Sequence, residues 1–114
     1  MKSFDFNAVQ QPTWPVSLGA GDTRTNVNLI YPTVDLFDRF TAMTPELQDA
    51  AKTKDANSVR AVFSVLAEIL SCNDDGFTFT AEELRDKYKL TLLGATKFVA
   101  GYMEFLREAQ EEKN

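Results

Sequence analysis

The 114-residue chain is 44% hydrophobic and 25% charged, and it contains no histidine. A chain of this length buries roughly 65% of its unfolded surface in one core, so we expect a single domain over residues 1–114. Without histidine there can be no Ser-His or Cys-His nucleophile pair, and a zinc site of the usual His/Cys type is excluded. We therefore expect a protein that is not an enzyme and that binds no metal or cofactor.

Charge and cysteine content narrow the possible partners and the compartment. Seventeen acidic against twelve basic residues give a net charge of −5, which disfavours nucleic-acid binding through a broad basic face. No run approaches the roughly 20 apolar residues of a membrane span, and the first residues lack the apolar core of a signal peptide. The single cysteine, Cys72, excludes an internal disulfide and fits a reducing compartment. We expect a soluble protein whose partners are neither nucleic acid nor membrane.

The front of the chain predicts an antiparallel hairpin. Apolar residues alternate with polar residues or proline over residues 13–18, which is the period of a half-buried strand, and Pro15 restricts that strand to a sheet edge. Alternation resumes over residues 23–31. The glycines in residues 19–22 predict a hairpin turn between the strands, because glycine adopts a positive φ without strain.

Residues 1–12 hold two aromatic residues, Phe4 and Phe6, and no sustained pattern. We leave open whether this segment is flexible. A sheet of two strands is marginal alone, so Phe4 and Phe6 could supply a third strand. The alternative is that the two rings anchor a partner.

Helix start signals follow the hairpin. Thr33 can cap a first helix over residues 33–43, and Thr44 before Pro45 predicts a second, short helix to about residue 51, because proline is favoured at the first helical position. A long amphipathic helix is expected over residues 58–72. The apolar positions of the first helix are Val34, Phe37, Phe40 and Met43.

The second half of the chain carries the strongest signals. Residues 73–76 end the long helix, and Thr80 with Glu83 forms a capping box, with Phe79 and Leu84 at the positions of a hydrophobic staple. Acidic residues over 108–114 oppose the helix dipole, so we expect a fraying tail there. The last helix carries an apolar stripe of Leu92, Ala95, Phe98, Val99, Tyr102, Phe105, Leu106 and Ala109.

The order of elements predicts an α+β fold, in which a short N-terminal antiparallel hairpin or sheet packs against about four to five α-helices. Asp74 and Asp75 with Gly76 do not match the spacing of a calcium loop, and we interpret them as turn residues. Cys72, at the end of an apolar helix, is interpreted as a packing residue.

Candidate partner-binding residues are the large apolar side chains with the fewest elements left to cover them. Aromatic residues at helical spacing usually belong to a core, and for Tyr102 we favour burial by roughly three to one. Phe105 and Leu106 lie nearer the chain end and are the better candidates. The predicted partner-binding set is Phe105, Leu106, Tyr102, Phe4 and Phe6.

Four segments of the chain resemble one protein family. They are residues 31–36 (YPTVDL), 67–73 (AEILSCN), 79–84 (FTAEEL) and 98–106 (FVAGYMEFL). Together with the hairpin they resemble the tail assembly chaperones of long-tailed bacteriophages and prophages of Gram-positive bacteria. The likeness covers residues 13–114 and consists of packing and capping signatures, with no catalytic fingerprint.

The resemblance implies a function in virion morphogenesis. Members of that family are small acidic α+β proteins that bind the long helical tape measure protein, keep it soluble and help to recruit the major tail protein. The resemblance thus implies these two partners, no cofactor and a location in the host bacterial cytoplasm, and it leaves self-association open. The runner-up is a structural virion component, such as a head-tail connector or a tail-completion protein, which would be found stoichiometrically in purified particles.

Overall fold

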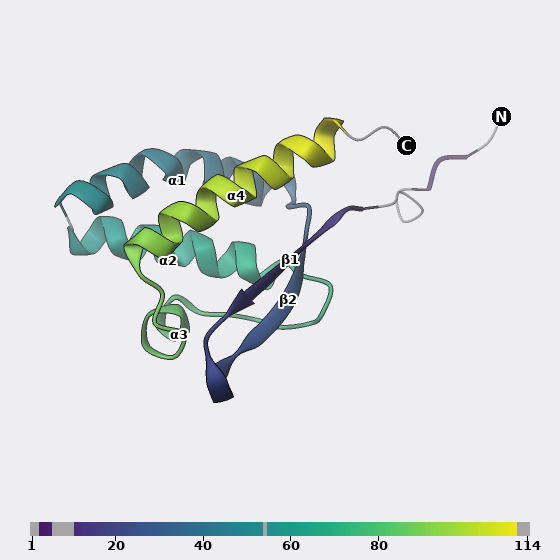
Figure 1. Ribbon diagram of the computed structural model, residues 1–114. Coiled ribbons are helices and arrows are strands. Elements are labelled where there is room, and N and C mark those ends of the chain that lie inside the picture. The colour runs from purple at the N-terminus through teal and green to yellow at the C-terminus, as the bar shows by residue number, and fades with distance from the viewer. Residues whose placement is uncertain (1–2, 6–10, 54, 112–114) are drawn as a thin grey trace.

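The computed structural model describes residues 3–5, 11–53 and 55–111, with the hairpin first and the helices after it (Figure 1). Strand β1 spans Thr13–Leu18 and β2 spans Thr25–Ile30, joined through the 3-10 helix η2 at Gly21–Thr23. Within the described residues four α-helices follow: α1 at Val34–Thr53, α2 at Ala56–Ser71, α3 at Ala81–Asp86 and α4 at Leu92–Glu111. The two-stranded antiparallel sheet with its helices confirms the predicted α+β fold.

The hairpin forms where the alternation predicts it. Trp14 lies opposite Leu29 and Val16 opposite Val27 in the register. Gly19 has a φ of 78°, and a Cβ atom there would stand 2.5 Å from the carbonyl oxygen of Thr23. Glycine is therefore required at this turn both by the backbone conformation and by the close approach of the chain.

The free edge of β2 is covered by the chain that follows α2. The Ile30 amide donates to the Cys72 carbonyl at 3.0 Å, and the Asp74 amide donates to the Asn28 carbonyl at 3.1 Å. The Asp75 carboxylate accepts from the Asn28 amide at 2.7 Å. Phe4 does not form the third strand that the N-terminal segment could have supplied, because it lies outside any helix or strand. Phe6 lies outside the described residues.

Helix α1 is one helix, and the prediction of two helices divided at Thr44 is wrong. Pro45 lies inside it. Proline has no amide to donate to the carbonyl four residues back, and here the hydroxyl of Thr44 donates to that carbonyl, on Thr41, at 2.9 Å. The buried stripe continues through the proline because its members recur every three or four residues: Leu36, Phe40, Met43, Leu47 and Ala50. Val34, predicted on the apolar face, is exposed.

The capping box before α3 is confirmed. The Thr80 side chain accepts from the Glu83 amide at 3.1 Å, and the Glu83 carboxylate accepts from the Thr80 amide at 3.1 Å. Phe79 and Leu84, at the staple positions, are both buried. Local residues therefore fix where this short helix begins.

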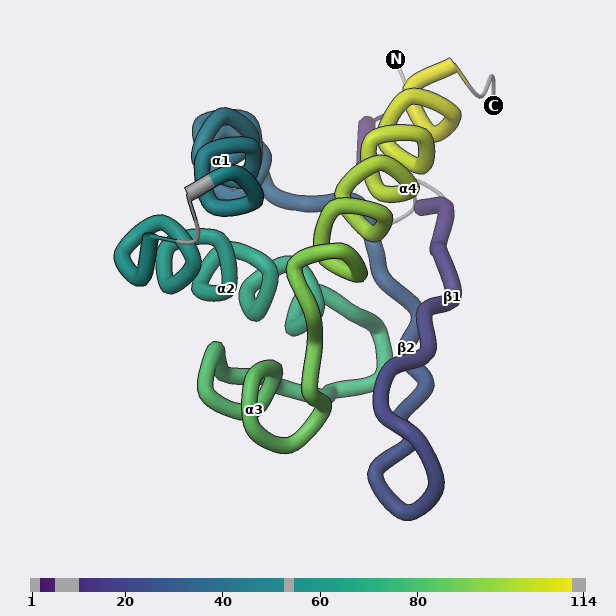
Figure 2. Tube along the Cα trace, turned by 60° about the vertical axis from the view of Figure 1, so that its left-hand side comes forward, coloured from purple at the N-terminus to yellow at the C-terminus, as the bar shows by residue number. Residues whose placement is uncertain are grey.

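The core lies between the helices and the inner face of the hairpin. Helices α1 and α2 lie side by side, and α4 runs between α1 and strand β1 (Figure 2). The C-terminal end of α4 is tied to the chain entering α1, because Gln110 donates from Nε2 to the Tyr31 hydroxyl at 2.8 Å. Of residues 108–114, predicted to fray, residues 108–111 belong to α4 and residues 112–114 lie outside the described residues.

Candidate functional site

The residues predicted to bind a partner are mostly buried. Tyr102 is 0% exposed, Leu106 is 6% exposed and Phe105 is 8% exposed. The expectation that Phe105 and Leu106 are uncovered is therefore wrong, and all three belong to the core. Phe4 is 69% exposed, whereas Phe6 lies outside the described residues.

Trp14 of β1 supplies the cover for α4. Its ring stacks on Phe98 with centroids 5.5 Å apart and on Phe105 with centroids 5.9 Å apart. Gly101 makes room for it, since a Cβ atom there would lie 3.0 Å from Cη2 and Cζ2 of Trp14. Sequence reasoning counted only the elements that follow Phe105 in the chain, whereas the covering ring comes from the first strand.

Tyr102 carries a buried polar atom at the centre of this aromatic cluster. Its ring meets Phe40 of α1 edge to face at 5.0 Å, and its hydroxyl has no hydrogen-bond partner among the described atoms. Burial is the main cause that raises the pKa of Tyr102, with smaller contributions from Cys72 and Tyr31. The hydroxyl therefore stays neutral further into the alkaline range than that of an exposed tyrosine.

Cys72 ends α2 beside this cluster and is half-buried. Burial raises the pKa of its thiol. A raised pKa lowers the thiolate fraction and so the reactivity of a cysteine. Among the described residues no group of three or more histidine, cysteine or acidic side chains could hold a metal ion. Within the same ranges, no helix is long and apolar enough to cross a membrane.

One surface groove runs between the second half of α1 and residues 96–103 of α4, and we call it the α1–α4 groove. Its volume is about 350 Å³, and none of its lining residues is charged. Met103 at its edge is 52% exposed. The lining residues are Thr44, Leu47, Gln48, Ala51, Thr96, Val99, Ala100 and Met103.

Sequence reasoning missed the α4 side of this groove. Thr96, Ala100 and Met103 recur at helical spacing on the face next to the buried stripe. A second uncharged face on a helix, beside the face that is buried, can be recognised in the sequence as a candidate binding surface. It was hidden by the stronger aromatic stripe beside it.

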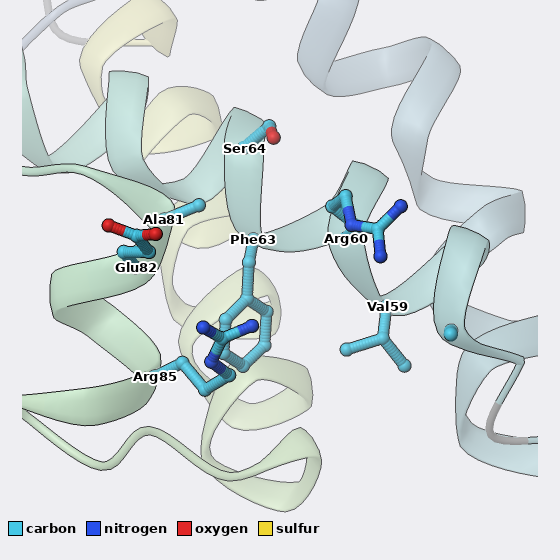
Figure 3. A pocket seen from close by; sticks show the side chains of 8 residues that line it. Val59, Arg60, Phe63, Ser64, Ala81, Glu82 and Arg85 are labelled. Atoms are coloured by element: carbon cyan, nitrogen blue, oxygen red, sulfur yellow. The ribbon is translucent and has the colours of Figure 1, made fainter.

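A second groove, the α2–α3 groove, differs in charge. Its volume is about 560 Å³. Figure 3 shows Val59, Arg60, Phe63 and Ser64 of α2 together with Ala81, Glu82 and Arg85 of α3, and Ala56 completes the lining. Apolar side chains of Ala56, Val59, Phe63 and Ala81 line it together with three charged ones, Arg60, Arg85 and Glu82.

The two arginines of the α2–α3 groove are not equivalent. Arg85 forms an ion pair with Asp86 at 2.9 Å, which holds the pKa of that carboxyl below its usual range. Arg60 has no ion pair among the described residues. Among the described residues, Arg60 is therefore the arginine of this groove without an ion pair, and Glu82 adds one negative charge to the same lining.

Comparisons of the chain with protein-family models, with curated proteins and with solved structures find no match. Two of the open grooves in the described part of the chain lie between helices, one lined by uncharged residues and one that carries Arg60, Arg85 and Glu82. Such surfaces suit the binding of another polypeptide.

Proposed function

We propose that this protein is a non-enzymatic tail assembly chaperone that binds the phage tape measure protein, keeps it soluble and helps to recruit the major tail protein in the host bacterial cytoplasm. The observation that carries the proposal is the α1–α4 groove. It supports the binding of a helical client, because amphipathic helices dock by placing apolar side chains in a groove between helices. The resemblance over residues 13–114 gives the client its identity.

The size of the groove suits a repetitive client. A volume of about 350 Å³ accepts one or two apolar side chains, so a single contact is weak. A long helical client offers many such side chains, and several weak contacts along one chain raise the overall affinity through effective concentration. The net charge of −5 keeps the complexes soluble by mutual repulsion.

The decisive experiment is co-expression with the tape measure protein of the same phage. The client should be soluble only when this protein is present, and the two should co-purify. A client that is equally soluble without this protein would overturn the proposal. Stoichiometric amounts of this protein in purified particles would favour the structural virion component instead.

Groove variants test where the client binds. Ala100→Lys and Met103→Lys place a charge in the uncharged groove at exposed positions, so they should leave the fold intact and reduce client co-purification at least about tenfold. Val34→Lys is the matched control, since Val34 is exposed on α1 and lies outside the groove. Equal loss in all three variants would show that binding does not use this groove.

A further inference from the structure

We propose that the α2–α3 groove binds a second copy of this protein, through the exposed ring of Phe77 and the carboxylate of Asp74. The interaction links copies head to tail. It does not depend on the identity of the client, so it stands or falls separately from the chaperone proposal.

The groove has the properties of a receptor for an apolar side chain with a negative charge beside it. Val59 and Phe63 give it apolar walls, and its volume of about 560 Å³ exceeds that of an aromatic ring. Arg60 stands at the edge without an ion pair among the described residues. A carboxylate next to the inserted side chain would supply the missing partner.

The loop after α2 presents that combination on the same molecule. Phe77 is 47% exposed, and Asp74 is exposed three residues before it. We call Asp74 and Phe77 the acidic knob. Among the other large apolar residues that are exposed in the described ranges, Val34, Leu93 and Met103 lie in helices and Phe4 lies in the N-terminal segment.

The knob is held in place before any partner binds. The Asn73 side chain donates to the carbonyls of Leu70 and Phe77, at 2.7 Å and 3.0 Å, and accepts from the Asp75 amide at 3.0 Å. The Asp75 carboxylate is occupied by the Asn28 amide, which leaves Asp74 as the acid for Arg60. A preorganised loop loses little conformational freedom on binding, and this favours association.

The positions of groove and knob decide the kind of assembly. The groove uses the first half of α2, from Ala56 to Ser64, whereas the knob follows the end of that helix at Ser71. The groove also includes Ala81 of α3, four residues after Phe77, but it shares no residue with the knob, so the two are different surfaces of the molecule. Contacts between two different surfaces are heterologous, and repeated contacts of this kind form rings or open chains.

The contact should be weak. One inserted Phe side chain buries roughly 150–250 Å², against about 800 Å² per partner in a stable interface. Association should therefore depend on concentration and fall as salt screens the exposed Arg60–Asp74 pair.

Sedimentation velocity of the purified protein tests the proposal. The weight-average sedimentation coefficient should rise with concentration up to about 1 mM, the weak end of the affinity range. Phe77→Ser and Arg60→Glu should each raise the dissociation constant at least about tenfold. The controls, Leu93→Ser and Arg24→Glu, alter another exposed large apolar residue and another exposed arginine and should change nothing. A wild-type protein that stays monomeric, or an association that Phe77→Ser leaves intact, would overturn the proposal.

Two mixing experiments establish the head-to-tail arrangement. Arg60→Glu retains the knob and Phe77→Ser retains the groove, so an equimolar mixture should form dimers and nothing larger. The double variant Arg60→Glu with Asp74→Arg restores opposite charges and should associate again, as the wild type does. A mixture that stays monomeric, or a double variant no better than Arg60→Glu alone, would show that these residues do not meet.

Discussion

At the residue scale, the contact between Gly101 and Trp14 attaches the hairpin to α4. A glycine in a helix interior costs about 1 kcal/mol relative to alanine, yet here its missing side chain leaves room for the Trp14 ring. That ring is stacked on both Phe98 and Phe105 and has little space to move. The helix loses intrinsic stability at Gly101 and gains a close contact with the first strand.

The first prediction concerns Gly101→Ala. Its Cβ atom would stand 3.0 Å from two atoms of the Trp14 ring, so overpacking should outweigh the gain in helix propensity and lower the free energy of unfolding by about 1 kcal/mol. Urea unfolding measures the change, and the emission of Trp14, the only tryptophan, reports the ring's displacement. Gly94→Ala on the same helix is the comparison and should cost less, since its Cβ atom would stand 3.3 Å from one side-chain atom, the Thr91 hydroxyl oxygen, and would meet no ring. Greater stability for Gly101→Ala than for Gly94→Ala would contradict the packing argument.

Tyr102 also lowers the stability of the core, because its buried hydroxyl has no hydrogen-bond partner among the described atoms. A buried polar group without a hydrogen bond costs about 1–3 kcal/mol. Tyr102→Phe should therefore be at least as stable as the wild type at neutral pH. The raised pKa of Tyr102 adds a consequence at alkaline pH.

The second prediction is a pH-dependent difference between the wild type and Tyr102→Phe. Above about pH 10 the tyrosine ionises in the unfolded chain but not in the folded protein, so the unfolded state binds fewer protons and wild-type stability falls as pH rises. The slope from this one group reaches about 1.4 kcal/mol per pH unit. In urea unfolding, the free energy of unfolding of Tyr102→Phe relative to that of the wild type should be higher at pH 11 than at pH 8. Parallel losses in the two proteins would mean that Tyr102 ionises as readily when folded.

At the scale of elements, Pro45 shows how local signals can mislead. Thr44-Pro45 reads as the start of a helix, but the apolar stripe of α1 continues through it from Phe40 to Leu47. Burial of that stripe outweighs the lost hydrogen bond, and the Thr44 hydroxyl occupies the Thr41 carbonyl. The sequence predicts the capping box at Thr80 correctly because both of its hydrogen bonds join residues three positions apart.

The third prediction separates a proline inside a helix from a proline at a helix start. Pro45→Ala in a continuous α1 restores an amide donor and should raise the free energy of unfolding by about 1–3 kcal/mol. If Pro45 began a separate helix, the substitution would be neutral or destabilising. Thermal and urea unfolding decide between these outcomes, with Glu46→Ala, an exposed neighbour, as the control for alanine in α1.

At the scale of the whole molecule, the hairpin and α4 depend on each other. A two-stranded hairpin is marginally stable alone, and here its Trp14 is packed against α4 while its outer edge is bonded to the chain after α2. In return, the strand covers the end of the apolar stripe on α4. Phe105 and Leu106 are thus core residues.

The fourth prediction tests that role. Phe105→Ser and Leu106→Ser each remove a core side chain and place a hydroxyl in the core, so each should lower the free energy of unfolding by about 3–5 kcal/mol. Met103→Ser on the same helix, at a position 52% exposed, should cost less than about 1 kcal/mol. Circular dichroism during urea unfolding gives both values. If Phe105→Ser and Leu106→Ser lowered the free energy of unfolding only slightly, the two residues would again be candidates for partner binding.

The sequence by itself determined several features that depend on neighbouring residues: the alternation of the two strands, the glycine turn, the capping box and the stripes of α2 and α4. These could be predicted because hydrogen bonding and periodicity act over a few residues. The tertiary structure alone decided that α1 continues through Pro45, that Phe105 is covered by Trp14 and that the edge of β2 is bonded to the segment after α2. Each of these joins residues far apart in the chain, and burial against a distant partner is a free energy that no local pattern contains.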